Sequence, residues 1–402
     1  MRLDRRLLLV PAMLLASALP ALAARRPAEL RLPDGGHARF PFDLRGQHIW
    51  VRGTVNGDSA WIVIDTGASA TVMDAGLAQK LGLRTVGTYQ ASGSAGSQPG
   101  TNVANVTVGL PGLVLRASTM NATDLSAFTL LAGHPMEVIL GYELFRECVV
   151  RFDYPARMID VWNRKHAPRD LGGSAVPMTL VHNHPYVEGA VTVAGHAPIA
   201  GRFVIDSGSG MAVAVTPEVV KQQNLLATQP RTLVAFGRGV GGEVQNHIGR
   251  AESFTLGDLK FDRPTLFMPD SSGGTIAAGG TLGNIGGQIL ERCRVTFDYA
   301  RSTVRFEPGP GFARPFEADM LGATLQRGAD GYAVRWVCPD SPASEAGIEA
   351  GDAVKSLDGQ PFTSLDPAAV RERLRTEGVT VKLGLLHAGT PRDVTVKLRR
   401  LI

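Results

Sequence analysis

The stretch Trp61-Ile-Val-Ile-Asp-Thr-Gly-Ala-Ser-Ala70 runs an apolar, strand-like segment straight into an aspartate. The later stretch Arg202-Phe-Val-Ile-Asp-Ser-Gly-Ser-Gly-Met211 repeats this pattern. Short apolar runs bounded by glycine are typical of buried strands. A carboxylate at the end of such a strand costs free energy unless it finds a partner. The doubled pattern indicates either a repeated structural element or the two halves of one paired site.

The similarity between the two copies continues upstream of each aspartate. The segment Ile49–Val55 with its Asn56-Gly57 turn corresponds to Tyr186–Val193 followed by Ala194-Gly195. Each segment predicts a hairpin with the strand that carries its aspartate.

Downstream, Val138-Ile-Leu-Gly141 corresponds to Gly283-Asn-Ile-Gly286, and Glu147–Tyr154 corresponds to Arg292–Tyr299. Asp65 lies 76 residues before Gly141, and Asp206 lies 80 residues before Gly286. Because letters and spacing both agree, we predict two half-domains of similar fold at residues 38–164 and 178–307.

Length and composition fit this organisation. A chain of 402 residues exceeds the usual size of a single hydrophobic core, which favours two or three domains. The 47 Gly and 25 Pro, between runs rich in Val, Thr and Ile, favour short strands and turns. We therefore predict a mainly β protein.

Two aspartates brought together by twofold symmetry have a defined chemistry. Two carboxylates a few ångströms apart do not both ionise easily, so they share a proton and titrate as a pair. Such a pair takes a proton from a bound water while it gives one to a carbonyl oxygen. The expected reaction is hydrolysis of an amide without a covalent intermediate, a metal or a cofactor.

Four short motifs together resemble the pepsin and retropepsin-like aspartic proteases over about residues 38–307. They are Asp65-Thr-Gly-Ala-Ser69, Asp206-Ser-Gly-Ser-Gly210, Ile139-Leu-Gly141 and Asn284-Ile-Gly286. The resemblance implies a bilobal pair of double-psi-type β-barrels with pseudo-twofold symmetry. It also implies peptide or protein substrates.

The same resemblance assigns roles to residues of this chain. Asp65 and Asp206 form the catalytic dyad. Six residues support the active-site loops, namely Thr66, Gly67, Ala68, Ser207, Gly208 and Ser209, with Thr66 and Ser207 as an interlocking hydroxyl pair. Glycine-rich hairpins that cover the substrate are expected around Gly93, Gly96, Gly239 and Gly241.

Two departures from the family pattern carry expectations of their own. No Tyr-Gly pair marks a pepsin-type flap, so the manner of substrate covering stays open. Position 68 is Ala where position 209 is Ser. In the family a hydroxyl at this position bonds the carboxylate and lowers its pKa. Ala68 therefore predicts activity nearer neutral pH than pepsin's.

The repeat does not recur after a linker-like stretch at residues 308–315, and residues 316–402 form a third unit. The motif Ser341–Asp352, a helix expected at Asp366–Arg375 and alternating strands after it resemble a bacterial PDZ domain. The resemblance places the groove for a peptide C-terminus at Leu321, Gly322, Ala323, Thr324 and Leu325. A closed groove remains the alternative, because the loop lacks the family's usual second glycine.

The N-terminus predicts export. Residues 1–23 contain Arg2, Arg5 and Arg6, a short apolar run and a small-residue cleavage site, which is typical of a secretory signal peptide. We expect a periplasmic or secreted protein without an integral membrane span, or a membrane-tethered one if the signal stays uncleaved. Loss of residues 1–23 lowers the formal charge from +4 to +2, which gives no electrostatic case for nucleic acid.

Three further patterns have ordinary structural explanations. Gly237-x-Gly-x-x-Gly242 has the letters of a dinucleotide fingerprint but no βαβ context, so a hairpin is expected. His182 and His184 lack partners at metal-ligand spacing and are expected at a solvated strand start. Cys148 and Cys293 occupy equivalent repeat positions; separate core thiols are favoured over a pair.

Two other functions stay open. The same fold without turnover is a peptide-binding adaptor, a pseudoprotease. A carbohydrate-active enzyme that uses two carboxylates is disfavoured, because aromatic residues make up only 6% of the chain.

Overall fold

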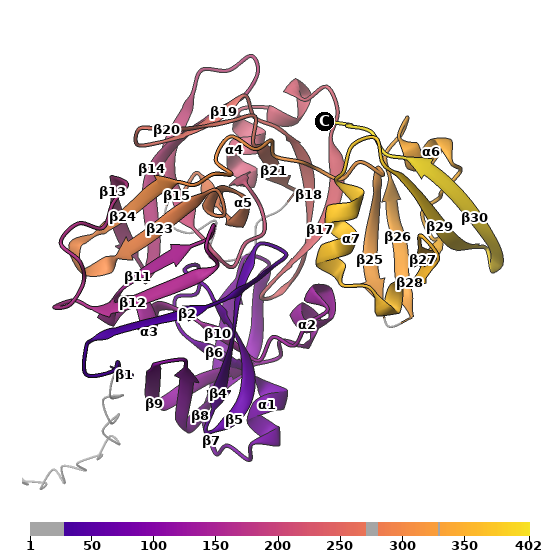
Figure 1. Ribbon diagram of the computed structural model, residues 1–402. Helices are drawn as coiled ribbons and strands as arrows, with labels where there is room; N and C mark the ends of the chain where they lie inside the picture. The colour runs from indigo at the N-terminus through magenta and orange to yellow at the C-terminus, as the bar shows by residue number, and fades with distance from the viewer. Residues whose placement is uncertain (1–27, 271–279, 329) are drawn as a thin grey trace, which may run out of the picture.

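The computed structural model describes residues 28–270, 280–328 and 330–402, so the predicted signal peptide lies outside the described residues. The described chain is mainly β and forms sheets of nine, fifteen and six strands. Figure 1 shows two large lobes and a smaller C-terminal unit beside them. Within the described ranges, no helix is long and apolar enough to cross a membrane.

The N-terminal lobe is built around the strand that leads to Asp65. Strand β5 (Asp58–Ile64) forms the expected hairpin with β4 (His48–Val55). It also pairs in parallel with β10 (Val138–Leu140), which pairs with β6 (Val72–Asp74). Because Ile62, Val63 and Ile64 are all buried, the apolar run needs cover on both faces, and the sheet supplies it. The remaining strands of this sheet are β1 (Glu29–Arg31), β3 (Asp43–Arg45), β7 (Thr85–Gly93), β8 (Gly96–Leu110) and β9 (Leu113–Thr123).

The C-terminal lobe repeats this arrangement. Strand β15 (Ile199–Ile205) leads to Asp206, pairs antiparallel with β14 (His184–Thr192) and pairs in parallel with β22 (Gly283–Ile285). The other strands of the lobe are β13 (Ser174–Val181), β16 (Val213–Val215), β17 (Leu233–Gly239), β18 (Gly242–Arg250), β19 (Ser253–Leu256), β20 (Leu259–Asp262) and β21 (Thr265–Pro269).

Short helices occupy matching places in the two lobes. The side chains of Asp74 and Thr216 cap the N-termini of α1 (Ala75–Lys80) and α4 (Pro217–Gln222) by accepting backbone N–H groups. The helices α3 (Tyr142–Glu147) and α5 (Gly287–Leu290) follow Gly141 and Gly286. The N-terminal lobe has one further helix, α2 (Ser126–Ala132).

One continuous sheet joins the lobes. Strands β11 (Cys148–Asp153) and β23 (Cys293–Asp298) pair antiparallel at its centre, flanked by β12 (Met158–Asn163) and β24 (Thr303–Pro308). Strand β2 (His37–Pro41) extends it next to β12. The antiparallel pairing places the two cysteines at opposite ends of the central pair. Both are buried free thiols, as expected.

The C-terminal unit has its own core and packs against both lobes. Its sheet runs β25 (Ala323–Gly328), β26 (Gly331–Val337), β27 (Ala353–Leu357), β29 (Thr380–His387) and β30 (Thr390–Lys397), with β28 (Gln360–Pro361) beside β27. Its helices are α6 (Pro342–Glu345) and α7 (Pro367–Leu374). In Figure 1, α7 lies between this sheet and the lobes. Strand β25 packs against α2 and β17, and Arg335 pairs with Glu243 of β18 at 3.2 Å.

Candidate active site

The two aspartates meet where the lobes meet. Asp65 follows β5, Asp206 follows β15, and a hydrogen bond joins their side chains. The Gly67 N–H donates to Asp65 Oδ1 at 2.7 Å, and the Gly208 N–H donates to Asp206 Oδ1 at 2.9 Å. Gly208 N also lies 3.1 Å from Asp65 Oδ1. The carboxylate at the end of β5 is therefore partnered from the other half of the chain.

Four buried hydrogen bonds lock the two loops together across the lobes. The Thr66 hydroxyl donates to the Ile205 carbonyl at 2.8 Å and accepts the Ser207 N–H at 2.9 Å. The Ser207 hydroxyl donates to the Ile64 carbonyl at 3.0 Å and accepts the Thr66 N–H at 3.0 Å. Both side chains are almost fully buried. The geometry is thus that of the predicted interlocking pair.

Glycine is required at positions 67 and 208 because the opposite aspartate lies so close. A Cβ on Gly67 would sit 2.5 Å from Asp206 Oδ1, and a Cβ on Gly208 would sit 2.3 Å from Asp65 Oδ2. Any side chain at either position would push the two carboxyls apart. The close approach of the loops therefore depends on these two residues.

The dyad is electrostatically asymmetric. Enclosure by the two lobes raises the pKa of Asp65 well above its usual range, and the neighbouring charge of Asp206 raises it further. Asp206 has an additional donor, because Asn284 Nδ2 lies 2.7 Å from Asp206 Oδ2. In the sheet registers Asn284 faces Val204 and Ile139 faces Val63, so the equivalent position in the first lobe is apolar. The shared proton is therefore favoured on Asp65.

Positions 68 and 209 pack beneath the loops. A Cβ on Gly141 would lie 2.5 Å from the Ala68 carbonyl, and a Cβ on Gly286 would lie 2.6 Å from the Ser209 carbonyl. The Ser209 hydroxyl accepts the Met211 N–H at 3.5 Å, a long contact. The polar asymmetry beside the dyad comes from Asn284, a residue to which the sequence analysis gave no role.

The two glycine-rich stretches form hairpins whose tips touch. Strands β7 and β8 turn at residues 94–95, and β17 and β18 turn at residues 240–241. The Ala95 N–H donates to the Val240 carbonyl at 3.2 Å. A Cβ on Gly93 would lie 2.6 Å from the Val240 Cβ, and a Cβ on Gly241 would lie 2.6 Å from the Gly96 Cα. The segment with dinucleotide-fingerprint letters is thus a hairpin, as expected.

Two histidines lie near the dyad, and sequence reasoning assigned neither of them to the site. The ring of His184 was expected in solvent, but it is half-buried, bonds the backbone of Gly67 and lies near Asp206. The ring of His48 bonds the backbone of Gly208 and also lies near Asp206. The hairpin register could have found both, because each histidine sits opposite the aspartate of its own lobe.

The predicted peptide groove of the C-terminal unit is partly occupied by the chain itself. Leu321, Gly322 and Ala323 are buried, and the Gly322 N–H donates to Asp319 Oδ1 at 2.8 Å. The backbones of Leu321 and Ala323 also hydrogen-bond this carboxylate. The Thr324 hydroxyl donates to the Val234 carbonyl of β17. This arrangement resembles the closed alternative more than an open groove.

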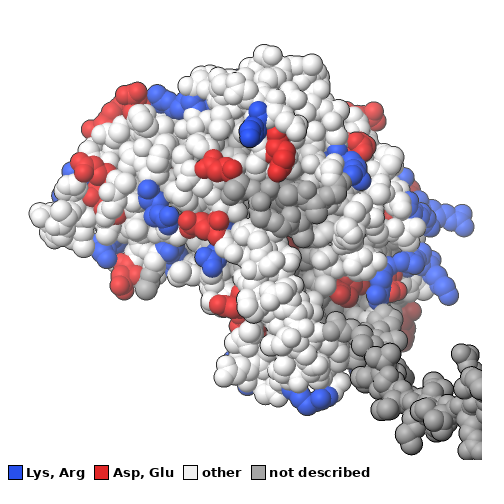
Figure 2. All heavy atoms as spheres, turned by 180° about the vertical axis from the view of Figure 1, so that it is seen from behind, with Lys and Arg blue, Asp and Glu red and all other residues white. Residues whose placement is uncertain are grey.

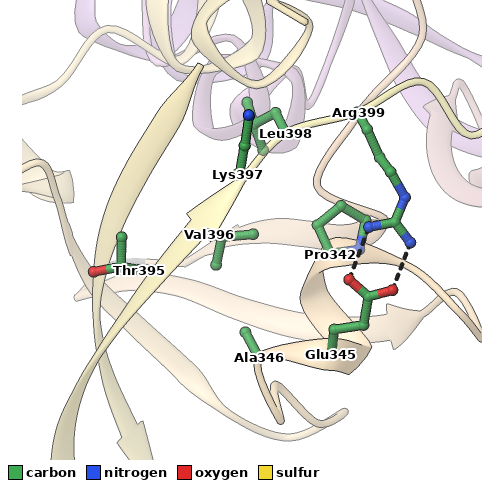
Figure 3. Close-up of a pocket in the computed structure, with 8 residues that line it drawn as sticks. All are labelled: Pro342, Glu345, Ala346, Thr395, Val396, Lys397, Leu398 and Arg399. Carbon is green, nitrogen blue, oxygen red and sulfur yellow. Dashed lines mark hydrogen bonds and ion pairs between the residues drawn. The ribbon is translucent and has the colours of Figure 1, made fainter. Parts of the chain in front are cut away.

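Two surface features lie away from the dyad. A hollow between α6 and β30 is bordered by Glu345 and Arg399, which form a bidentate ion pair with N–O distances of 2.8 and 2.7 Å (Figure 3). On the face drawn in Figure 2, acidic and basic side chains are interspersed. Among the described residues, no group of three or more His, Cys, Asp or Glu side chains is placed to hold a metal ion.

Each of the two carboxyls that meet between the lobes is held by its own Asp-Thr/Ser-Gly loop. Residues 51–144 and 190–284 both match the family model described as aspartyl protease, and residues 334–387 match a PDZ domain model. The two lobes are therefore aspartyl-protease-like domains, and the C-terminal unit is a PDZ domain. Both recognitions made from the sequence are confirmed.

Individual relatives match smaller parts. The chain is 42% identical over 83 residues to the periplasmic pH-dependent serine endoprotease DegQ of Escherichia coli K12, covering 20% of this chain. It is 42% identical over 85 residues, 21% of its length, to the periplasmic serine endoprotease DegP of Salmonella typhimurium LT2. The chain spans only 17% of the length of each of these relatives.

A solved structure of the aspartic proteinase from Irpex lacteus aligns with a TM-score of 0.43 at 12% identity, over 69% of this chain and 98% of that one.

Proposed function

We propose that this protein is an exported aspartic-type endopeptidase in which Asp65 and Asp206 activate one water molecule. The observation that carries the proposal is the dyad itself. The two carboxyls share a hydrogen bond, each accepts a glycine N–H, and four cross-lobe hydrogen bonds hold the loops in register. The Deg relatives are named serine endoproteases, but the match does not support a serine mechanism for this chain, because it covers only 17% of those proteins.

The asymmetry of the dyad gives each aspartate a role. Asp206, stabilised as the anion by Asn284, takes a proton from water as the oxygen attacks the peptide carbonyl carbon. Asp65, which holds the shared proton, donates it to the carbonyl oxygen as the tetrahedral gem-diol intermediate forms. The dyad then carries the proton taken from water. This proton passes to the leaving nitrogen as the C–N bond breaks, one hydroxyl proton returns to the dyad, and a carboxylic acid and an amine are released.

The touching hairpins support a covered substrate channel. Their tips meet through the bond from Ala95 to Val240, so a peptide that enters must part the hairpins or thread beneath them. Rigid loops under a cover are a common arrangement in hydrolytic enzymes, because closure removes bulk water while the one water held by the dyad stays as the reactant. Export is supported by the signal-peptide pattern of residues 1–23 and by the Deg relatives, which are named as periplasmic proteins.

The decisive test is hydrolysis of a quenched peptide library by the mature protein between about pH 3 and 8, with and without pepstatin. Asp65→Asn and Asp206→Asn are assayed beside Asp340→Asn, whose exposed side chain lies outside the site. The proposal expects cleavage that pepstatin inhibits and that either dyad substitution abolishes, while Asp340→Asn leaves it unchanged.

The adaptor alternative has its own signature in the same experiment. A folded protein that binds library peptides but cleaves none at any pH would refute the enzyme and favour a peptide-holding role. Cleavage that survives both dyad substitutions would place catalysis elsewhere.

A further inference from the structure

His48 and His184 occupy equivalent positions in the internal repeat. In the first lobe Ile49 pairs with Ile64, so the next step of the register places His48 opposite Asp65. In the second lobe Tyr186 pairs with Val204, and two steps further His184 lies opposite Asp206. Each histidine also follows a two-residue turn whose residues both have positive φ, at residues 46–47 and 182–183.

Each histidine reaches across to the aspartate loop of the other lobe. The His48 ring bonds the backbone of Gly208, and its Cε1 lies 3.8 Å from where a Cβ on Gly210 would be. The His184 ring bonds the backbone of Gly67. The turns make crossing contacts as well, since Asn183 Nδ2 donates to the Ser69 carbonyl at 3.1 Å. Each lobe thus contacts the aspartate loop of the other lobe through an equivalent histidine.

We propose that His48 and His184 are positioning residues that hold the opposite glycine loop in its catalytic geometry. The glycines they bond are the ones whose N–H groups hold the carboxyls of Asp65 and Asp206. A small shift of either loop moves both carboxyls, and misplacement by about 1 Å costs on the order of 10²-fold in rate.

The charges around the rings of His48 and His184 also make the dyad sensitive to pH. Burial lowers the pKa of both histidines, so both rings are neutral at neutral pH. His48 faces Asp206, Arg371 of α7 and the backbone of Arg45, while His184 faces Asp206 and His182. As pH falls and the rings gain charge, each cation attracts the negative charge that the dyad shares. The pair therefore extends activity toward acidic pH.

The inference rests on the proposed function, and two kinds of variant test it. His48→Gln and His184→Gln keep a hydrogen-bond donor but never gain a charge. His48→Phe and His184→Phe keep a ring but lose the donor, and His166→Gln, an exposed histidine, is the control. We expect the Phe variants to lose about 10²-fold in kcat with KM little changed. The Gln variants should retain kcat at neutral pH within about threefold, with the acid limb moved to higher pH.

Hydrogen exchange supplies a readout that does not depend on activity. His48→Phe should speed amide exchange more in residues 206–210 than in residues 65–69, and His184→Phe should do the reverse. Unchanged exchange in both loops would overturn the inference even if the protein proved inactive. If the protein is active, wild-type kcat in the Phe variants would also overturn the inference. So would Gln variants that lose as much kcat as the Phe variants while their acid limb stays at the wild-type pH.

A different observation carries a second inference, on the PDZ domain. Three successive backbone N–H groups, at Leu321, Gly322 and Ala323, converge on the Asp319 carboxylate. Convergent backbone N–H groups form an anion-binding nest, the feature with which peptide-recognition domains capture a C-terminal carboxylate. We infer that Asp319 is the resident occupant of this nest and excludes the carboxylate of a peptide C-terminus while it is ionised.

The Asp319 carboxylate should lose its charge, and with it its hold on the N–H groups, at mildly acidic pH. Burial raises the pKa of Asp319 to about 6, and the facing cation is Arg375 at the end of α7. The loop is tied to the same helix end, because the Met320 N–H donates to the Leu374 carbonyl at 2.9 Å. A peptide α-carboxyl, with a pKa of about 3.5, stays ionised after Asp319 has become neutral. The nest should therefore accept external carboxylates between about pH 4 and 6.

Binding of fluorescein-labelled decapeptides tests this inference on the full chain. A pool ending in Val, Leu, Ile, Phe or Ala is offered with free or amidated C-termini at pH 5 and pH 7.5. Wild type should bind free-carboxyl peptides at least tenfold more tightly at pH 5, and Asp319→Ala should bind them equally at both. Asp319→Asn is uncharged and nearly isosteric, so it controls for misfolding of the Asp319→Ala variant. It should also lose the pH dependence of binding. The control variant Asp340→Asn should keep the pH dependence. Equal wild-type binding at both pH values, or no binding by any variant, would overturn the inference.

Discussion

Removal of the Thr66 hydroxyl should both loosen the lobes and disable the site. Thr66→Val keeps the shape of the side chain but deletes the donor to the Ile205 carbonyl and the acceptor of the Ser207 N–H. Each buried backbone group left without its partner costs about 1–3 kcal/mol, so the two together predict a loss of about 2–6 kcal/mol. Because the same bonds hold the dyad loops, kcat should fall on the order of 10²-fold.

The matched control is Thr395→Val, the same substitution at an exposed position of β30, which should change stability by less than about 0.5 kcal/mol. Guanidinium unfolding followed by tryptophan fluorescence measures the stability of the lobes, because Trp50 is buried in the first lobe. A Thr66→Val/Ser207→Ala double variant should be less destabilised than the sum of the two single variants. If Thr66→Val unfolds at the wild-type midpoint and retains wild-type kcat, the interlock does not hold the dyad.

Three further outcomes follow from the site. Because burial raises the pKa of Asp65, its contribution to stability is present below the pKa of the unfolded chain and is lost as pH rises through the pKa of the folded protein. In a thermal-shift assay, Asp65→Asn should therefore raise the melting temperature more at pH 9 than at pH 4. An equal rise at both pH values would contradict this. Asn284→Leu removes a hydrogen-bond donor to the Asp206 carboxyl, so kcat should fall on the order of tenfold, and an unchanged kcat would deny Asn284 a role in the dyad. Gly93→Ala places a methyl group against Val240 and should raise KM several-fold with kcat less affected; unchanged KM would separate the hairpin tips from substrate binding.

Much of the organisation could be predicted from local patterns. The apolar runs before Asp65 and Asp206, each flanked by a hairpin partner, specify buried strands whatever the rest of the chain does. The repeat of these patterns predicted two similar lobes, and the Ser341–Asp352 motif predicted the third unit. Patterns of this kind are local because strand and turn preferences act over a few residues.

Contacts between distant segments could not be predicted in the same way. The motif Asn284-Ile-Gly286 does not reveal that Asn284 donates to Asp206, because that contact depends on the parallel pairing of β22 with β15. His184 was placed in solvent, because the residue that covers it comes from the other lobe. No local pattern indicates a role for Asp319, since only the fold of the loop turns three N–H groups toward it.

The sequence by itself determined the repeated strands, the two aspartates at their ends and the order of the three units, because each depends on neighbouring residues. Only the tertiary structure decided which aspartate holds the proton, which histidines brace the loops and what fills the PDZ nest. Those properties depend on burial and on hydrogen bonds between residues far apart in the chain, and neither exists until the lobes have packed.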